Sequence, residues 1–353
     1  FCLSRGLGDV YKRQVVAVAR YGAQVEIAPA ALEEVAATRE RVEELAQDPT
    51  PLYGISTGFG ALARRHIPEE MRAQLQLSLV RSHAAGTGPE VEEEVIRALM
   101  LLRLSTLCTG RTGVRPVVVE TYAKALNAGI VPVVREYGSL GCSGDLAPLA
   151  HCALALLGEG EVRVNGKLQD AGEALAAAGI EPLQLREKEG LALINGTDGM
   201  LGQLCLAITD LRAAAKTADI ATAMNVEGLL GTLVVFADDL QQLRPHPGQA
   251  DAAANILQVA EGSEILEAAL EEFKKNQVQD AYSVRCAPQV AGGFRDTLTH
   301  TAQVAERELA AAVDNPVVTK DGRVVSNGNF HGAPVAYALD FLAIVVADLA
   351  SIS

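Results

Sequence analysis

The chain has little of what marks a nucleic-acid-binding protein. It contains no tryptophan, and aromatic residues make up only 4% of its 353 residues. Its 30 lysine and arginine residues are outnumbered by 44 aspartate and glutamate residues, so the formal net charge is −14 and the isoelectric point about 5.0. Because an acidic surface repels phosphate groups, this composition argues against a nucleic-acid partner.

Long uninterrupted hydrophobic runs are also missing. The strongest candidate for a membrane span, residues 336–352, is interrupted by Asp340 and Asp348. A spanning helix needs about 20 predominantly apolar residues with few or no charges. We therefore expect this segment to be a buried helix, and we expect no membrane partner.

Cysteine is sparse and scattered, and no two cysteines form a CxxC pair. This spacing predicts reduced thiols, mostly in the core, and a cytoplasmic location. The six histidines show no HExxH or HxH spacing, so we expect no metal site. The six cysteines are Cys2, Cys108, Cys142, Cys152, Cys205 and Cys286.

Alanine and leucine dominate what is present, and 49% of the residues are hydrophobic. Apolar residues recur at helical spacing through much of the chain, and Asn165-Gly166 predicts the turn of a hairpin at 159–168. The expected fold is mainly α, with a small mixed α/β N-terminal part followed by a long-helix bundle. Helices are predicted at 30–47, 71–83, 91–108, 115–127 (opened by Pro116), 146–157, and about 199–243, 251–276 and 294–313.

Three parts are expected along the chain. Residues 1–14 lack clear periodicity and predict a leader that is disordered or not native to the domain. Residues 15–198 predict an N-terminal domain that carries two glycine-rich loops. Residues 199–353 predict a central helical bundle, which we expect to be truncated at its C-terminal end because the last apolar stretch has no cap.

The segment GSLGCSGDLAPLAH, residues 138–151, interrupts the helical pattern with three glycines and two serines. One interpretation is a turn in which Asp145 caps the helix that begins at Leu146. The other is a backbone cyclisation of Cys142-Ser143-Gly144, in which the Gly144 amide bonds to the Cys142 carbonyl and the serine loses its hydroxyl. That reaction requires a central serine, a following glycine and a small preceding residue, all of which are present.

A second glycine-rich segment, YGISTGFG at residues 53–60, carries a Gly58-x-Gly60-x-x-Ala63 pattern. This pattern mimics a dinucleotide-binding fingerprint, but no β-rich strand precedes it and no acidic residue follows at the expected distance. We therefore expect no nucleotide cofactor here. A flexible lid loop with Tyr53 at its tip is the better interpretation.

Eight segments in order resemble the aromatic amino acid ammonia-lyases, from about residue 15 to residue 353. In that family the Ala-Ser-Gly triplet forms a 4-methylidene-imidazol-5-one (MIO) ring autocatalytically; here Cys142 replaces alanine. The resemblance therefore implies an MIO group built from Cys142-Ser143-Gly144. The segments are YGISTGFG (53–60), RSHAAGTGP (81–89), GSLGCSGDLAPLAH (138–151), NGTDGM (195–200), RPHPGQ (244–249), QDAYSVRCAPQVAG (279–292), DNPVV (314–318) and SNGNFHGAPVA (326–336).

The resemblance also implies roles for individual residues. Tyr53 would be the base that removes the substrate's β-proton, and Tyr282 would lie near its amino group. Arg285 would hold the α-carboxylate, since a guanidinium matches a carboxylate bidentately. The remaining predicted pocket residues are His83 on the substrate side chain, Asn195, Gln279, and Phe330 stacking on the substrate ring.

Each of these residues also has a purely structural interpretation. Tyr53 could anchor a loop, His83 could be a satisfied structural histidine, and Arg285 could cap a helix or pair with Asp280. Asn329 and His331 are predicted to support the site from behind. The resemblance is what favours the catalytic interpretation.

The implied reaction is the non-oxidative deamination of an amino acid, and the motifs around His83, Arg285 and His331 favour histidine as the substrate. The product would be trans-urocanate. A tyrosine lyase or a tyrosine 2,3-aminomutase is the alternative, and a non-catalytic scaffold or an inactive fragment is a further one. The resemblance implies a homotetramer with active sites shared between subunits.

Overall fold

The computed structural model describes residues 2–3, 12–47, 51–273 and 278–353, and the chain divides into two compact units. The first unit spans residues 1–206 and 305–336, and the second spans 207–304 and 337–353. This division differs from the expected boundary at residue 198 because residues 305–336 return to the first unit. The expected leader, residues 1–14, lies mostly outside the described residues, but residues 12–14 already belong to the first helix.

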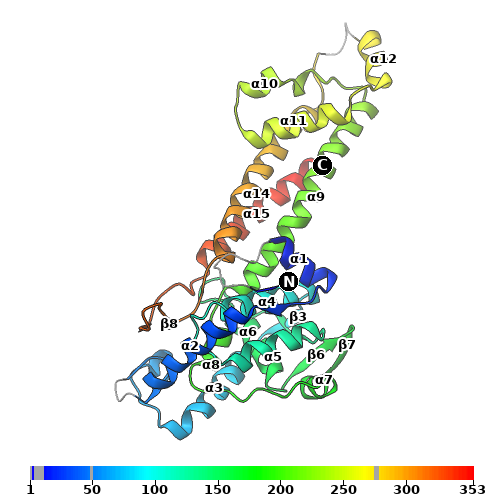
Figure 1. The fold of residues 1–353 in the computed structure, drawn as a ribbon. Helices are drawn as coiled ribbons and strands as arrows, with labels where there is room; N and C mark the ends of the chain where they lie inside the picture. The colour runs from blue at the N-terminus through cyan, green and yellow to red at the C-terminus, as the bar shows by residue number, and fades with distance from the viewer. Residues whose placement is uncertain (1, 4–11, 48–50, 274–277) are drawn as a thin grey trace. The chain divides into compact units, whose positions relative to one another are not determined.

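The first unit surrounds a helical core with small sheets (Figure 1). Its helices are α1 (Lys12–Tyr21), α2 (Pro29–Ala46), the 3₁₀ helix η1 (Gly60–Leu62), α3 (Glu69–His83), α4 (Glu93–Leu107), α5 (Pro116–Asn127), α6 (Leu146–Leu156), α7 (Ala171–Ala177) and α8 (Glu189–Ile194). Its strands are β1 (Cys2–Leu3), β2 (Glu26–Ile27), β3 (Thr87–Glu90), β4 (Val131–Pro132), β5 (Arg135–Tyr137), β6 (Glu161–Val164), β7 (Lys167–Asp170), β8 (Val317–Val318) and β9 (Val324–Val325).

The core of this unit is built from α4, α5, α6 and α8, most of whose apolar side chains are buried. All six residues of α8 are buried, so this helix lies inside the unit rather than on its surface. The predicted hairpin is confirmed: β6 and β7 pair antiparallel, and Asn165 and Gly166 adopt φ of 51° and 74° at the turn. Pro116 opens α5 as predicted.

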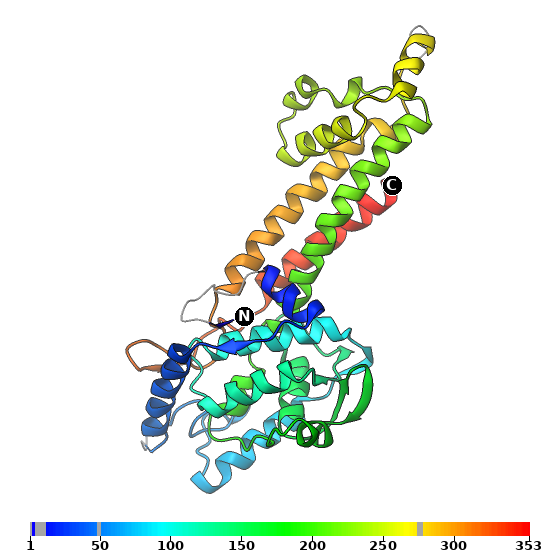
Figure 2. The same ribbon diagram turned by 45° about the vertical axis from the view of Figure 1, so that its right-hand side comes forward.

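The second unit contains long helices with shorter helices at one end, as both views show (Figures 1 and 2). Arg295 on α14 pairs with Asp219 on α9, which joins two of the long helices. The unit is built from parts of α9 (Asp198–Gly228), α14 (Ala287–Leu309) and α15 (Ala333–Ile352), with η2 (Val234–Phe236), α10 (Asp238–Gln242), α11 (Pro247–Val259), α12 (Glu264–Phe273) and α13 (Tyr282–Arg285).

Three predicted helices have different bounds in the structure. The helix predicted at 199–243 was wrong beyond Gly228, where the chain turns through Leu230 at φ 54°. The helix predicted at 251–276 is interrupted at Gly262, whose φ is 74°. Its last three residues, 274–276, lie outside the described residues. The helix predicted at 294–313 begins earlier, at Ala287, and ends at Leu309.

The segment expected to be a buried helix is α15, and that expectation was wrong for this chain. Among the described residues, two helical segments are long and apolar enough to cross a membrane, Glu189–Gly228 and α15. The apolar window of the first is 89% buried within the chain, whereas that of α15 is only 22% buried. An apolar composition predicts that the surface of a helix will be buried, but it does not predict whether residues of the same chain bury it.

Candidate active site

The triplet Cys142-Ser143-Gly144 lies in a loop that ends where α6 begins. Gly144 adopts φ 78°, a left-handed conformation that glycine reaches without the penalty of a side chain. A Cβ at this position would stand 2.5 Å from the Gly196 carbonyl oxygen and 3.3 Å from the Phe330 carbonyl oxygen. Two other loops therefore close on Gly144, and only a residue without a side chain fits between them.

The Cys142 carbonyl lies against the Phe330 loop, where the Gly332 amide donates a hydrogen bond to it at 2.8 Å. The second loop is tied to the same segment by the Asp145 amide, which donates to the Gly196 carbonyl oxygen at 2.6 Å. The Cys142 side chain is exposed, whereas Cys108, Cys152 and Cys205 are buried. Burial raises the pKa of Cys108 and Cys205 to about 12, so these thiols belong to the core, as predicted for most of the cysteines.

Asp145 occupies the N-cap position of α6, but its side chain makes no capping hydrogen bond. The capping interpretation is therefore wrong in its chemistry. The carboxylate instead accepts from the Ser139 hydroxyl at 2.6 Å and from the Met200 amide at 2.9 Å. It also lines a pocket of about 380 Å³ behind the loop. Burial raises the pKa of Asp145 to about 6.

Asn195 is 5% exposed and directly follows α8. Its Nδ2 donates to the Asn315 carbonyl at 2.9 Å and to Asp314 Oδ1 at 3.5 Å. Asp314 in turn accepts from Lys188 Nζ at 2.5 Å, and both of these side chains are fully buried. The sequence had not indicated Lys188 or Asp314 as site residues.

Tyr53 lies in a loop held by several main-chain hydrogen bonds. Its hydroxyl accepts from the Gly60 amide at 3.5 Å, and its ring meets Phe59 edge-on at 6.3 Å between centroids. The neighbouring Gly54 approaches Leu191 of α8 and Pro316 so closely that an added Cβ would stand 2.9 and 3.4 Å from their side chains. The Tyr53 loop therefore packs on the elements that flank Asn195.

His83 ends α3, and its Nδ1 lies 2.9 Å from the Leu79 carbonyl oxygen and 3.0 Å from the Ser82 hydroxyl. A carbonyl oxygen can only accept, so the contact with Leu79 is a hydrogen bond in the tautomer that is protonated at Nδ1, and that tautomer leaves Nε2 as an acceptor. Three residues further on, the Gly86 amide donates to His151 Nε2 at 3.1 Å. Gly86 also lies against Gly138, where the loop that contains the triplet begins.

Phe330 is partly buried, and its loop is tied to Asn315. The Asn315 side-chain oxygen accepts from the Ser326 hydroxyl and the Asn327 amide at 3.0 and 2.9 Å. His331, predicted to be a supporting residue, accepts from the Ala333 amide through Nδ1 at 3.3 Å, at the start of α15. The first unit thus brings the triplet, Asn195 and Phe330 into one cluster.

The remaining predicted residues belong to the second unit. Gln279 and Tyr282 are exposed, and Arg285 holds its guanidinium 5.3 Å from the centroid of the Tyr282 ring. Within the described part of the chain, Arg285 forms no ion pair, and its buried Nε has no hydrogen-bond partner. The predicted alternative, a pair with Asp280, is therefore wrong, since Asp280 Oδ2 accepts from the Thr232 amide at 2.9 Å.

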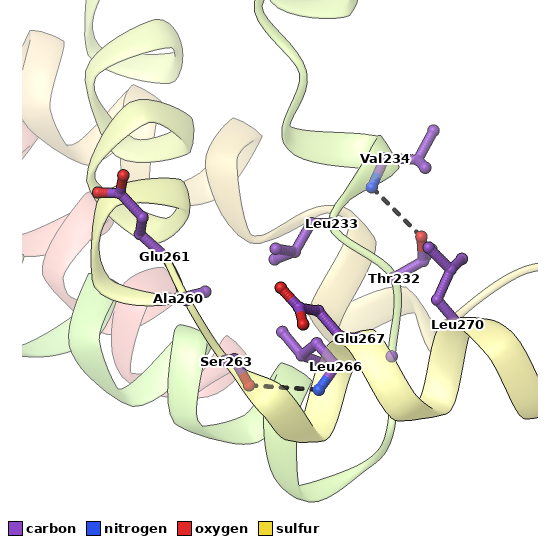
Figure 3. Close-up of a pocket in the computed structure, with 11 residues that line it drawn as sticks. Thr232, Leu233, Val234, Ala260, Glu261, Ser263, Leu266, Glu267 and Leu270 are labelled. Carbon is purple, nitrogen blue, oxygen red and sulfur yellow. Dashed lines mark hydrogen bonds between the residues drawn. The ribbon is translucent and has the colours of Figure 1, made fainter.

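The second unit also contains a pocket of about 250 Å³ between residues 231–234 and α12 (Figure 3). Leucine side chains and two glutamates line it, and it contains none of the predicted site residues. Among the described residues, no three histidine, cysteine, aspartate or glutamate side chains are arranged to hold a metal ion. The cluster around Gly144 is therefore the candidate site that the geometry favours.

Several known proteins are similar to this chain. Histidine ammonia-lyase of Streptomyces avermitilis is 62% identical over 349 residues, which is 99% of this chain and 68% of that protein. The histidine ammonia-lyase of Gloeobacter violaceus is 47% identical over 96% of this chain and 66% of that protein.

Solved structures of two enzymes are also similar to this chain. Tyrosine aminomutase from Streptomyces globisporus aligns with a TM-score of 0.91 at 37% identity, over 99% of this chain and 69% of that one. Histidine ammonia-lyase from Trypanosoma cruzi aligns with a TM-score of 0.85 at 38% identity, over 97% and 64%. The aromatic amino acid lyase family matches residues 11–353. The chain belongs to the aromatic amino acid lyase family.

Proposed function

We propose that this protein is a carbon–nitrogen lyase that removes ammonia from L-histidine to give trans-urocanate. The observation that carries the proposal is the closure of two loops on Gly144, with Asn195 and Phe330 beside the triplet. The identity of 62% to a histidine ammonia-lyase over almost the whole chain supports histidine as the substrate.

The residues present fit an MIO group formed from Cys142-Ser143-Gly144. Ring formation joins the Gly144 nitrogen to the Cys142 carbonyl carbon with loss of one water, and Ser143 loses a second water to give the methylidene. Gly144 has no Cβ to oppose the close approach, and the Gly332 amide donates to the carbonyl that is attacked. Such a ring supplies an electrophile that makes the substrate's amine a better leaving group.

The protein's own residues would bind the substrate and move the proton. Arg285, whose Nε has no hydrogen-bond partner among the described residues, is suited to the α-carboxylate. His83 Nε2 is suited to accept the N–H of an imidazole, because Nδ1 is engaged by Leu79. Tyr53 would take the β-proton, and holding base and proton in register would supply much of the acceleration. Tyr282, Gln279, Asn195 and Phe330 would complete the pocket.

We further propose that the protein acts as a cytoplasmic homotetramer with shared active sites. The buried free thiols support a reducing compartment. On α15, exposed aromatic and aliphatic side chains recur at helical spacing: Tyr337 is 74% exposed, Phe341 47% and Ile344 68%. An apolar stripe of this kind supports burial against another subunit.

A substrate comparison tests the proposed activity. Full-length protein is offered L-histidine, L-tyrosine or L-phenylalanine, and ultraviolet absorbance reports the conjugated acrylate product. We expect turnover of histidine alone, together with an intact mass two waters below the sequence value. A Ser143→Ala control should keep both waters and be inactive. Turnover of tyrosine in place of histidine would favour the alternative, a tyrosine lyase or aminomutase.

A further inference from the structure

Lys188 occupies an unfavourable position for a lysine. Its side chain is 0% exposed, and its backbone adopts φ 73°, a left-handed conformation that non-glycine residues rarely adopt. Nζ donates to Asp314 Oδ2 at 2.5 Å, and Asp314 is also 0% exposed. A buried ion pair is often no more stabilising than apolar residues of the same size. Fold stability alone therefore does not account for this pair.

The second oxygen of Asp314 faces Asn195. Asp314 Oδ1 accepts from Asn195 Nδ2 at 3.5 Å, while Oδ2 accepts from Lys188. Asn195 Nδ2 also donates to the Asn315 carbonyl oxygen at 2.9 Å, an atom that can only accept. These two acceptors determine which way the carboxamide is turned. Its Oδ1 accepts no hydrogen bond from any residue in the described ranges and stays available to a ligand.

We propose that Lys188 is a positioning residue that, through Asp314, holds the Asn195 carboxamide with its oxygen free to accept from the substrate's ammonium group. This rests on the proposed function, in which Asn195 contacts the substrate. Lys188 holds Asp314 through Oδ2, so that Oδ1 faces Asn195. Without the lysine, Oδ2 loses this partner, and Asp314 is no longer fixed beside the carboxamide. The carboxamide then loses one of the two acceptors that orient it, and its oxygen is held less firmly toward the ammonium.

Lys188 is difficult to replace because its ammonium is the cation that pairs with Asp314 inside a buried group of charges. Arg103 Nη1 lies 3.2 Å from Asp198 Oδ2, and these side chains are buried close to Lys188 and Asp314. Removing Lys188 leaves the buried Asp314 carboxylate without its cationic partner, so a shift of Asp314 away from Asn195 is the expected response.

A double-mutant cycle tests the proposal in the full-length protein. The four proteins are wild type, Lys188→Met, Asn195→Ala and the double variant, and kcat, KM and intact mass are measured for each. We expect Lys188→Met to lower kcat about 10- to 100-fold, the scale of a misplaced contact, with the two-water mass loss unchanged. In the Asn195→Ala background the same change should alter kcat by less than about 3-fold. If the fold-losses in kcat of the two single variants multiply in the double variant, the proposal is overturned. An unchanged kcat in Lys188→Met would overturn it as well.

Arg115 offers a matched control at the same end of α8. Its guanidinium donates to Glu189, another carboxylate with 0% side-chain exposure, but no contact links Glu189 to Asn195 in the described structure. Arg115→Met should lower thermal stability as much as Lys188→Met and leave kcat within about 3-fold. If Arg115→Met reproduces the loss of kcat, Lys188 acts only by holding α8, and the proposal fails.

A second variant covers the case in which Lys188→Met does not fold. Lys188→Met/Asp314→Asn removes both charges, and the asparagine Oδ1 can still accept from Asn195 and from the Asn315 amide. We expect it to fold and to recover most of the wild-type kcat. A folded, neutral pair that stays as slow as Lys188→Met would contradict the proposal.

The outcomes of these experiments also distinguish a failure of this proposal from a failure of the proposed function. The cycle can be measured with whichever amino acid the wild-type protein turns over, so activity on tyrosine would change the substrate and leave the test intact. If wild type turns over histidine but Asn195→Ala is fully active, the proposed function stands and the role of Lys188 is refuted.

Discussion

At the scale of single residues, Gly144 combines a left-handed backbone with the close approach of the Gly196 carbonyl oxygen. Gly144→Ala adds a Cβ 2.5 Å from the Gly196 oxygen at φ 78°. We expect the variant to retain both waters in its intact mass, and to lose at least about 1,000-fold in turnover because residues that act as one catalytic unit fail together.

Gly166 is the matched control for this substitution. It has φ 74° at the hairpin turn, and a Cβ there would meet nothing within 4 Å. Gly166→Ala should cost only the backbone penalty, about 1–2 kcal/mol, with normal mass loss and turnover. A Gly144→Ala protein that loses two waters would show that the close approach is unimportant for ring formation.

Asp145 predicts a pH dependence of stability. Burial raises its pKa from 3.8 to about 6 in the folded chain, so the folded state holds this proton where the unfolded chain has released it. Folding is therefore favoured below about pH 4, and the advantage is lost as the pH rises through about 6.

The difference from Asp145→Asn isolates this contribution, because the asparagine does not titrate. Since one pKa unit corresponds to about 1.4 kcal/mol, wild type should lose about 2–3 kcal/mol more than the variant between about pH 4 and pH 7. Denaturant unfolding at each pH measures it. Parallel pH profiles of the two proteins would contradict the raised pKa.

Residue patterns pointed to the triplet but not to the residues that support it. A serine followed by glycine permits the cyclisation, but the same pattern also fits a simple turn, and the resemblance is what favours Ser143 and Gly144 as site residues. Lys188 could not be found this way, since EKEG reads as an exposed turn. Its burial depends on Asp314, which is 126 residues away, and no local pattern reports a contact at that separation.

At the scale of elements, Asp170 shows what a capping interaction contributes here. It precedes α7, and its Oδ1 accepts from the Gly172 and Glu173 amides at 2.8 and 3.2 Å. Asp170→Ala should lower the free energy of unfolding by about 1 kcal/mol without affecting turnover. Asp170→Asn keeps the accepting oxygen and should cost much less. Equal losses in both variants would assign the effect to charge rather than to the cap.

Element boundaries were predictable where a residue enforces them locally. Pro116 and the Asn165-Gly166 turn act through their own backbone, so α5 and the hairpin were predicted correctly. The end of α9 at Gly228 was missed because apolar residues continue beyond it, at 229–230 and 233–236, and mimic helical periodicity. Of these, Leu233, Val235 and Phe236 pack in a hydrophobic cluster with residues of later helices, which is a tertiary contact that periodicity does not report.

At the scale of the whole molecule, the division into two units separates the predicted site residues. Tyr53 and the triplet belong to the first unit, and Arg285 belongs to the second. The exposed apolar stripe on α15 supports an assembly of several chains. In a tetramer with shared sites, one chain would supply Tyr53 and another Arg285 to the same pocket.

Mixing two inactive variants tests this arrangement. Tyr53→Phe and Arg285→Ala proteins each spoil every site when alone, but a mixed tetramer would contain some pockets in which both residues are intact. We expect co-refolded or co-expressed mixtures to recover roughly a quarter of wild-type turnover when subunits associate at random in a symmetric assembly, measured as acrylate product per tetramer. Each variant mixed with itself is the control. Mixed tetramers verified by mass that stay inactive would show that Tyr53 and Arg285 act within one chain.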